Sequence, residues 1–288
     1  MRESWKDRLL QHSITIILCI LGFIALVPLI SVVSMSFSSK AAADMNSVNL
    51  WPVGFTLASW QYILTDQGLW RAFFVTLTST LLGTAIALIV TALMAYPLSK
   101  PDFLIGRWVM LFVIITMIFK APVVPYFLTL KGMKLVNNPA VLVLPHILTA
   151  YNLAIMRTFF KQFPAEVEEA AKIDGCGYFQ ILAKIILPSS KAILTTVGLF
   201  YAVTLWNQFQ HPMMFIQDPQ LFPLQLKVRQ LIGGGSEIAN VAMAANVNYS
   251  ESTLSAATVV FAVLPIVAVY PWLQKYFTKG AMLGSVKG

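Results

Sequence analysis

Long apolar segments constrain this chain more than any other feature of its sequence. Six of them approach the length of a membrane-spanning helix, and they cover about residues 14–36, 70–98, 107–129, 138–160, 191–212 and 254–276. A helix needs about 20 apolar residues to cross the hydrocarbon core of a bilayer. Backbone groups find no water there, so each segment is expected to be helical. The alternating strands of about ten residues that build a membrane barrel are absent.

The composition agrees with a membrane protein. Hydrophobic residues make up 58% of the chain and charged residues 11%, whereas soluble domains average about 25% charged residues. The first apolar segment continues to about Met35, beyond the roughly 7–15 residues of a signal peptide, and so predicts a retained helix. We therefore predict an all-α membrane protein with one transmembrane domain over residues 1–288.

The positions of the basic residues predict the orientation. Thirteen of the twenty Lys and Arg residues fall on the side of the N-terminus, and cytoplasmic loops carry the excess of such residues. Both termini and the loop 161–190 are therefore expected in the cytoplasm, and segments 37–69 and 213–253 outside. The net charge of +8 is spread between apolar segments, which argues against a nucleic-acid-binding surface.

Prolines within or near the spans predict kinks, because proline removes a backbone donor. They are Pro28, Pro122, Pro125, Pro145 and Pro265. Such kinks can mark a flexible pathway or ordinary packing, and the sequence leaves both open.

Several function classes lack the residues that they need. Acidic residues lie in loops or at segment edges, whereas an ion-coupled carrier needs charges within its spans. The glycine cluster 233–235 is followed by Ser236 and Glu237, without the lysine of a phosphate-binding loop, so ATP is expected on partner chains. The two cysteines and three scattered histidines form no disulfide framework or zinc spacing. A membrane enzyme is not indicated either, because no span contains a nucleophile paired with a base.

The loop between the fourth and fifth segments predicts two short helices and a turn. Pro164 suits a first helical turn, and Glu166, Glu168 and Glu169 lie near the positive end of the helix dipole. Gly175 and Gly177 permit the turn. One expected face of the first helix contains Val167, Ala170, Ala171 and Asp174, and one stripe of the second contains Phe179, Leu182, Ile185 and Ile186. These faces pack against the chain's own spans or against a partner.

The same loop resembles the signature loop of ABC importer membrane subunits. The pattern is E-A-A, three residues, G, nine residues, I-x-L-P, and it is met at Glu169, Ala170, Ala171, Gly175, Ile185, Leu187 and Pro188, with Asp174 inside it. The resemblance implies the type I importer permease fold. It also implies that this loop forms a coupling helix seated in a groove of an ATPase subunit.

Other stretches resemble carbohydrate importers, in particular the second, shorter permease of the maltose type. They are Y-P-L-S-K at 96–100, M-R-T-F-F at 156–160, W-N at 206–207, P-L-Q-L at 223–226 and G-S-V-K-G at 284–288. The variant is most similar to subunits for complex or acidic oligosaccharides such as alginate or pectin fragments. The resemblance implies a bacterial inner-membrane complex with a second permease, two ATPase subunits that hold ATP and Mg²⁺, and an extracytoplasmic solute-binding protein. This chain needs no cofactor. A non-sugar cargo, or an ion-coupled carrier, is the alternative.

Three further groups of candidate residues follow from position or resemblance. The tail residues Gly284, Ser285 and Lys287 are expected at the ATPase interface. Gln225, Lys227 and Arg229 of the outer segment are expected to contact the binding protein, or are simply solvated. Aromatic and amide side chains suit a sugar pathway, or bond between helices instead. Those candidates are Tyr151, Asn152, Trp206, Asn207 and Gln208.

Overall fold

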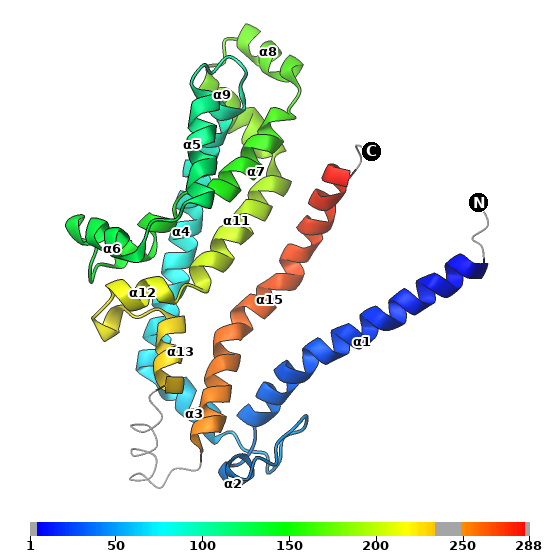
Figure 1. Ribbon diagram of the computed structural model, residues 1–288, viewed down its shortest axis with the longest axis vertical. Coiled ribbons are helices and arrows are strands. Elements are labelled where there is room, and N and C mark those ends of the chain that lie inside the picture. The colour runs from blue at the N-terminus through cyan, green and yellow to red at the C-terminus, as the bar shows by residue number, and fades with distance from the viewer. Residues whose placement is uncertain (1–4, 234–248, 286–288) are drawn as a thin grey trace. The chain divides into compact units, whose positions relative to one another are not determined.

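The computed structural model describes residues 5–233 and 249–285, in which helices are joined by turns and loops and no strand occurs. The predicted all-helical class is therefore confirmed. The chain divides into two compact units, residues 1–70 with 227–264, and residues 71–226 with 265–288. Figure 1 shows the helices of each.

The first unit contains α1 (Trp5–Ser36), α2 (Lys40–Asp44), α3 (Ala58–Thr65) and the first residues of α15 (Glu251–Ser285). Polar contacts tie α3 to α15, where Ser59 donates a hydrogen bond to Thr253 at 2.9 Å. The ring of Phe37 stacks on that of Trp60 at 5.4 Å and fixes the chain at the end of α1. The apolar window of α1 is exposed within its own unit as far as the described residues go, which suits a helix that faces lipid or another subunit.

The second unit is built around α4 (Gln67–Ser99), from Arg71 onward. Its other elements are α5 (Gly106–Ile118), α6 (Val123–Gly132), η1 (Pro139–Leu142), η2 (Leu144–His146), α7 (Ala150–Lys161), α8 (Ala165–Ile173), α9 (Tyr178–Ile181), η3 (Leu182–Ile186), α10 (Leu187–Ser189), α11 (Lys191–Trp206), α12 (Gln210–Phe215), η4 (Pro219–Leu221) and α13 (Leu224–Gly233), which continues into the first unit. Helix α7 packs against α5 and α11. In Figure 1, α8 and α9 lie at one end of these helices and α6 and α12 at the other.

Glycines let α4 and α11 approach closely. A Cβ on Gly83 would lie 2.7 Å from Leu205 Cδ1, and a Cβ on Gly198 would lie 3.2 Å from Leu88 Cδ1. Small residues at such crossings are typical of membrane helices. Nearby, the Thr91 and Tyr201 hydroxyls lie 2.7 Å apart, and Tyr201 accepts a hydrogen bond from the Thr149 N–H at 3.1 Å.

Among the described residues, three single helices and up to three bent helix pairs are long and apolar enough to span a membrane, which is consistent with the six predicted spans. The single helices are Leu10–Ser36, Gln67–Ser99 and Glu251–Val269. One bent pair, Tyr178–Ser189 with Lys191–Trp206, includes residues of the loop 161–190 as well as the fifth predicted span. The span predicted at 107–129 is broken between α5 and α6, and the chain bends by 119° at this break. The span predicted at 138–160 begins with two 3₁₀ turns and bends by 46° before α7. Helix α11 ends at Trp206, short of the predicted residue 212.

The histidines are scattered in sequence, but two of them meet in the fold. The rings of His146 and His211 lie edge to face at 5.0 Å, and the Tyr126 hydroxyl lies 2.7 Å from His211 Nε2. Phe215 packs against the same imidazole at 4.7 Å. These contacts join η2, α6 and α12. Among the described residues, no group of three or more His, Cys, Asp or Glu side chains could hold a metal ion.

Candidate functional site

The loop between α7 and α11 forms a compact helical element rather than an irregular connection. Helix α8 follows Pro164, with Glu166 and Glu168 in its first turn and Lys172 in its last. Acidic groups at the start of a helix and basic groups at its end both favour the helix dipole. The sequence therefore folds locally as predicted, into a first helix, a turn and a second helical segment.

Gly175 ends α8 with a defined hydrogen-bonded turn. Its φ of 82° is in the left-handed region that glycine adopts without steric cost. The Gly175 N–H donates to Lys172 O at 3.0 Å, and the Cys176 N–H donates to Ala171 O at 2.9 Å. This pair of bonds is the Schellman motif, which satisfies the last carbonyls of the helix. Gly177 then starts α9, and its N–H donates to the Gln180 side chain at 3.2 Å.

The two predicted apolar faces divide differently in the structure. Val167, Ala170 and Asp174 are exposed, as one face of α8, whereas Ala171 points inward and is buried in the core. In the second helix, Leu182 and Ile186 are buried, but Phe179 is 71% exposed. The chain itself therefore covers the stripe at Leu182 and Ile186, which lie in a π-helix over residues 182–186, and leaves Phe179 open to a partner.

The outer surface of the loop carries large exposed apolar side chains. Ile173 is 86% exposed and Tyr178 is 64% exposed, beside Phe179. The ammonium of Lys172 lies 5.0 Å from the centre of the Tyr178 ring. An exposed apolar patch with charged neighbours is typical of a protein–protein contact.

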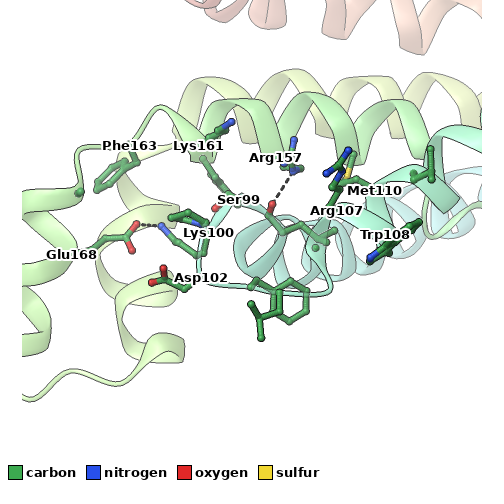
Figure 2. Close-up of a pocket in the computed structure, with 18 of the residues that line it drawn as sticks. Ser99, Lys100, Asp102, Arg107, Trp108, Met110, Arg157, Lys161, Phe163 and Glu168 are labelled. Atoms are coloured by element: carbon green, nitrogen blue, oxygen red, sulfur yellow. Dashed lines mark hydrogen bonds and ion pairs between the residues drawn. The ribbon is translucent and has the colours of Figure 1, made fainter.

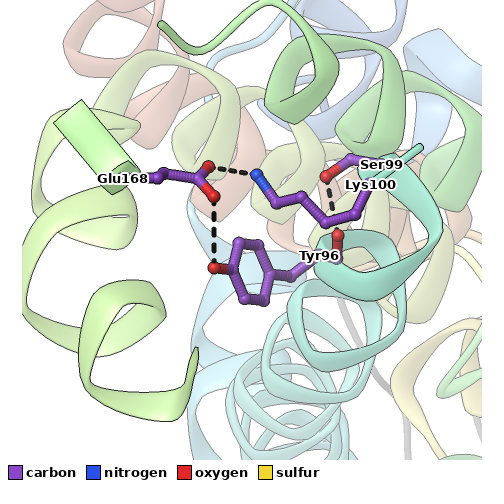
Figure 3. A network of polar contacts seen from close by, with 4 residues as sticks. All are labelled: Tyr96, Ser99, Lys100 and Glu168. Carbon is purple, nitrogen blue, oxygen red and sulfur yellow. Dashed lines mark hydrogen bonds and ion pairs between the residues drawn. The ribbon is translucent and has the colours of Figure 1, made fainter. Parts of the chain in front are cut away.

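A partly buried ion pair anchors the inner side of α8. Glu168 is 5% exposed and pairs with Lys100, which follows the last residue of α4. The Tyr96 hydroxyl donates to the second carboxylate oxygen at 3.5 Å, as Figure 3 shows. The Lys100 ammonium also lies 4.8 Å from the centre of the Tyr96 ring. A buried carboxylate requires such partners, so this contact fixes α8 against the end of α4.

Sequence reasoning missed this anchor, although it singled out both of its segments. Tyr96 and Lys100 belong to the stretch Y-P-L-S-K, and Glu168 precedes the E-A-A pattern. One signal in the sequence could have indicated the pair. The predicted orientation places Lys100 and the neighbouring Glu168 and Glu169 on the same side of the membrane, where opposite charges can meet. Arg157 adds a second link, because its Nε donates to Leu98 O at 2.7 Å.

With this geometry in place, comparisons identify the chain's relatives. Residues 83–282 match the family described as binding-protein-dependent transport system inner membrane component. The chain belongs to this family. It is 36% identical over 286 residues to the polygalacturonan/rhamnogalacturonan transport system permease protein YtcP of Bacillus subtilis (strain 168), covering 98% of this chain and 100% of that protein.

Two further relatives extend the likeness. The arabinooligosaccharides transport system permease protein AraQ of Halalkalibacterium halodurans is 27% identical over 286 residues, covering 97% of this chain and 98% of that one. A solved structure, of a bacterial ABC transporter involved in the import of the acidic polysaccharide alginate, superposes with a TM-score of 0.89 at 31% identity. It covers 96% of this chain and 99% of the other.

Membership confirms the predicted importer permease fold and the predicted type of function. An inner membrane component of a binding-protein-dependent system is a transport subunit, and ATP hydrolysis belongs to separate ATPase subunits. The alternatives of an ion-coupled carrier and of a membrane enzyme are thereby removed.

The structure divides the candidate pathway residues into two groups. Tyr151 is exposed at the start of α7 beside Phe200, while Asn152 is buried there. At the end of α11, Trp206 and Gln208 are buried, and the Gln208 amide donates to Leu142 O at 3.2 Å. Asn207 is exposed and caps α11 by donating to Val203 O. The Gln208 bond to a distant element is of the kind predicted as the alternative to a sugar contact, whereas the Asn207 bond lies within the last turn of its own helix.

The remaining candidates lie on α13 and at the end of α15. On α13, Gln225 and Lys227 are half-buried and Arg229 is exposed. Gly284 and Ser285 are the last residues of α15, so the helix continues beyond the predicted residue 276. Lys287 lies outside the described residues.

Proposed function

We propose that this chain forms half of the translocation pathway of an ABC importer for complex, acidic oligosaccharides. It pairs with a second permease, two ATPase subunits that hold ATP and Mg²⁺, and an extracytoplasmic solute-binding protein. Both termini and the loop 161–190 lie in the cytoplasm. The chain acts as one transmembrane domain, and its ATPase contact is the exposed surface of α8 and α9.

The anchored coupling loop carries the mechanism. Its outer side presents Ile173, Tyr178 and Phe179, and its inner side is tied to α4 through Glu168 and Lys100. Closure of the ATPase pair would therefore move α8 and α4 together, because the buried ion pair resists separation. Rigid elements that carry such a motion to the substrate path are the basis of alternating access.

The cargo proposal rests on the named relatives. A permease for polygalacturonan and rhamnogalacturonan and an importer of alginate both handle uronate polymers, and both match nearly the whole chain. Gln225, Lys227 and Arg229 are proposed to contact the binding protein, and Gly284, Ser285 and Lys287 the ATPase interface. Tyr151 and Trp206 are proposed on the pathway, with Asn152, Asn207 and Gln208 beside them.

Charge reversal tests the docking surface. In the reconstituted complete transporter, Glu169→Lys should lower substrate-stimulated ATP hydrolysis and uptake by at least about tenfold, the cost of roughly 1.4 kcal/mol of coupling. Glu169 is exposed on α8. Asp44→Lys is the matched control, since Asp44 is exposed at the end of α2 in a proposed outer segment. Equal activity of both variants and the wild type would refute the docking role.

Competition for uptake tests the cargo separately. Cells that carry the transporter should take up labelled oligogalacturonate or oligoalginate, and the unlabelled acidic oligomers should compete. Neutral arabino-oligosaccharides should not compete. Uptake of the neutral oligomer alone would overturn the acidic cargo while leaving the docking surface intact.

A further inference from the structure

A pocket of about 1220 Å³ opens where the α4–α5 connection meets α7 and α8. Its walls are unusually rich in charged groups for a chain with 11% charged residues, as Figure 2 shows. Five basic side chains line it, Lys100, Arg107, Arg157, Lys161 and Lys172, against three acidic ones, Asp102, Glu168 and Glu169. Because Lys100 and Glu168 neutralise each other, the rest of the lining carries a surplus of positive charge.

The surplus is available to a ligand. Arg107 and Lys161 are exposed on α5 and α7, and neither forms an ion pair within residues 5–233 and 249–285. The bond from Arg157 Nε to Leu98 O holds that guanidinium in the wall. The three cations thus come from two helices that pack against each other.

The other wall is apolar and runs along α5. Trp108, Leu111 and Ile114 line the pocket at intervals of three residues, directly after Arg107. Trp108 is 69% exposed, and the other two are close to half exposed. The seven residue steps from Arg107 to Ile114 span about 10 Å of helix, so the lining changes from basic to apolar along that distance.

We propose that this pocket binds an anionic phospholipid of the cytoplasmic leaflet. The headgroup phosphate lies against Arg107, Arg157 and Lys161, and an acyl chain follows Trp108, Leu111 and Ile114. Basic pockets between membrane helices on the cytoplasmic side suit anionic headgroups, and tryptophan suits the interface. A soluble anion would use the basic rim but not the apolar wall. The leaflet rests on the proposed orientation, whereas the binding chemistry does not.

Photolabelling of the complete purified transporter tests the site. Phosphatidylglycerol with a photoreactive acyl chain should label the segment 108–114, and the same probe built on phosphatidylcholine should label it at least about fivefold less. The double substitution Arg107→Gln with Lys161→Gln should weaken phosphatidylglycerol labelling by about fivefold for each cation removed. Lys191→Gln should leave it unchanged, since Lys191 is exposed on the same proposed face but lies outside the pocket lining.

Three results would overturn the site. Equal labelling by the two lipids would show that the cations do not select an anionic headgroup. Displacement of the phosphatidylglycerol probe by inorganic phosphate would show that the apolar wall adds nothing to binding. A photoreactive group at Leu111 that captured an ATPase or permease subunit would show that protein fills the pocket. The position of the wild-type label decides the question even if the double variant fails to assemble.

Discussion

Glu168 and Lys100 join segments that lie 68 residues apart in the sequence. Removing one partner from a buried ion pair leaves the other charge uncompensated, which costs about 3 kcal/mol. Lys100→Ala should therefore lower the thermal midpoint of the purified transporter clearly. Replacing both charges, with Lys100→Met and Glu168→Leu, should restore most of the stability, because no buried charge is left.

Glu166→Ala is the control for the ion pair. Glu166 lies on the same helix and is exposed, so its removal should change the thermal midpoint little. If the double variant were as unstable as Lys100→Ala, the ion pair would not be the source of the loss.

Gly175 and Gly177 offer a matched pair at the turn of the coupling loop. A Cβ at either position would meet nothing within 4 Å, but φ is 82° at Gly175 and −73° at Gly177. Gly175→Ala should cost about 1–2 kcal/mol through the left-handed backbone alone, and Gly177→Ala should be nearly neutral. Uptake and thermal stability of the two variants check this. Equal effects of the two substitutions would show that the left-handed backbone at Gly175 is not the source of any loss.

At this scale the sequence predicted the turn but not the anchor. Gly175 follows an acidic, amphipathic run, and local rules for helix ends identify it. The inward direction of Glu168 depends on a distant tertiary partner, which no local pattern encodes. Ala171 also faces the core while Val167, Ala170 and Asp174 face outward, and Phe179 is exposed while Leu182 and Ile186 are buried.

The close crossing of α4 and α11 determines how much volume Gly83 can tolerate. Gly83→Leu would overpack the buried Leu205 and should cost about 1–3 kcal/mol. Gly22→Leu on α1 is the matched control, since nothing lies within 4 Å of a Cβ there. Thermal midpoints of the two purified variants should differ by several degrees. Equal midpoints would show that this crossing is not tight.

Hydropathy located the helical elements but not their breaks. Hydropathy predicts 107–129 as one span, yet the helix stops at Ile118 and resumes after Pro122, with Lys120 in the break. Pro145 lies within the 3₁₀ turn before α7. In contrast, Pro28 and Pro265 lie inside α1 and α15. A proline therefore marks a possible kink, and packing of neighbouring elements decides whether the helix breaks.

On the scale of the whole chain, the charge count placed the α4–α5 connection and the coupling loop on one face of the membrane. The contact between Lys100 and Glu168 brings these two segments together, which agrees with that prediction. The sidedness itself stays a prediction, because the structure contains no bilayer.

Single-cysteine labelling tests this sidedness. In a background with Cys19→Ser and Cys176→Ser, an impermeant maleimide should label Asp218→Cys in intact spheroplasts and Lys184→Cys only in inverted vesicles. Neither side chain is fully buried: Asp218 lies half-buried just before η4, and Lys184 is exposed in η3. The excess of basic residues on the inner face gives the expected direction. The reverse labelling pattern would place α8 outside the cell, where no ATPase is available, and would overturn the docking proposal with it.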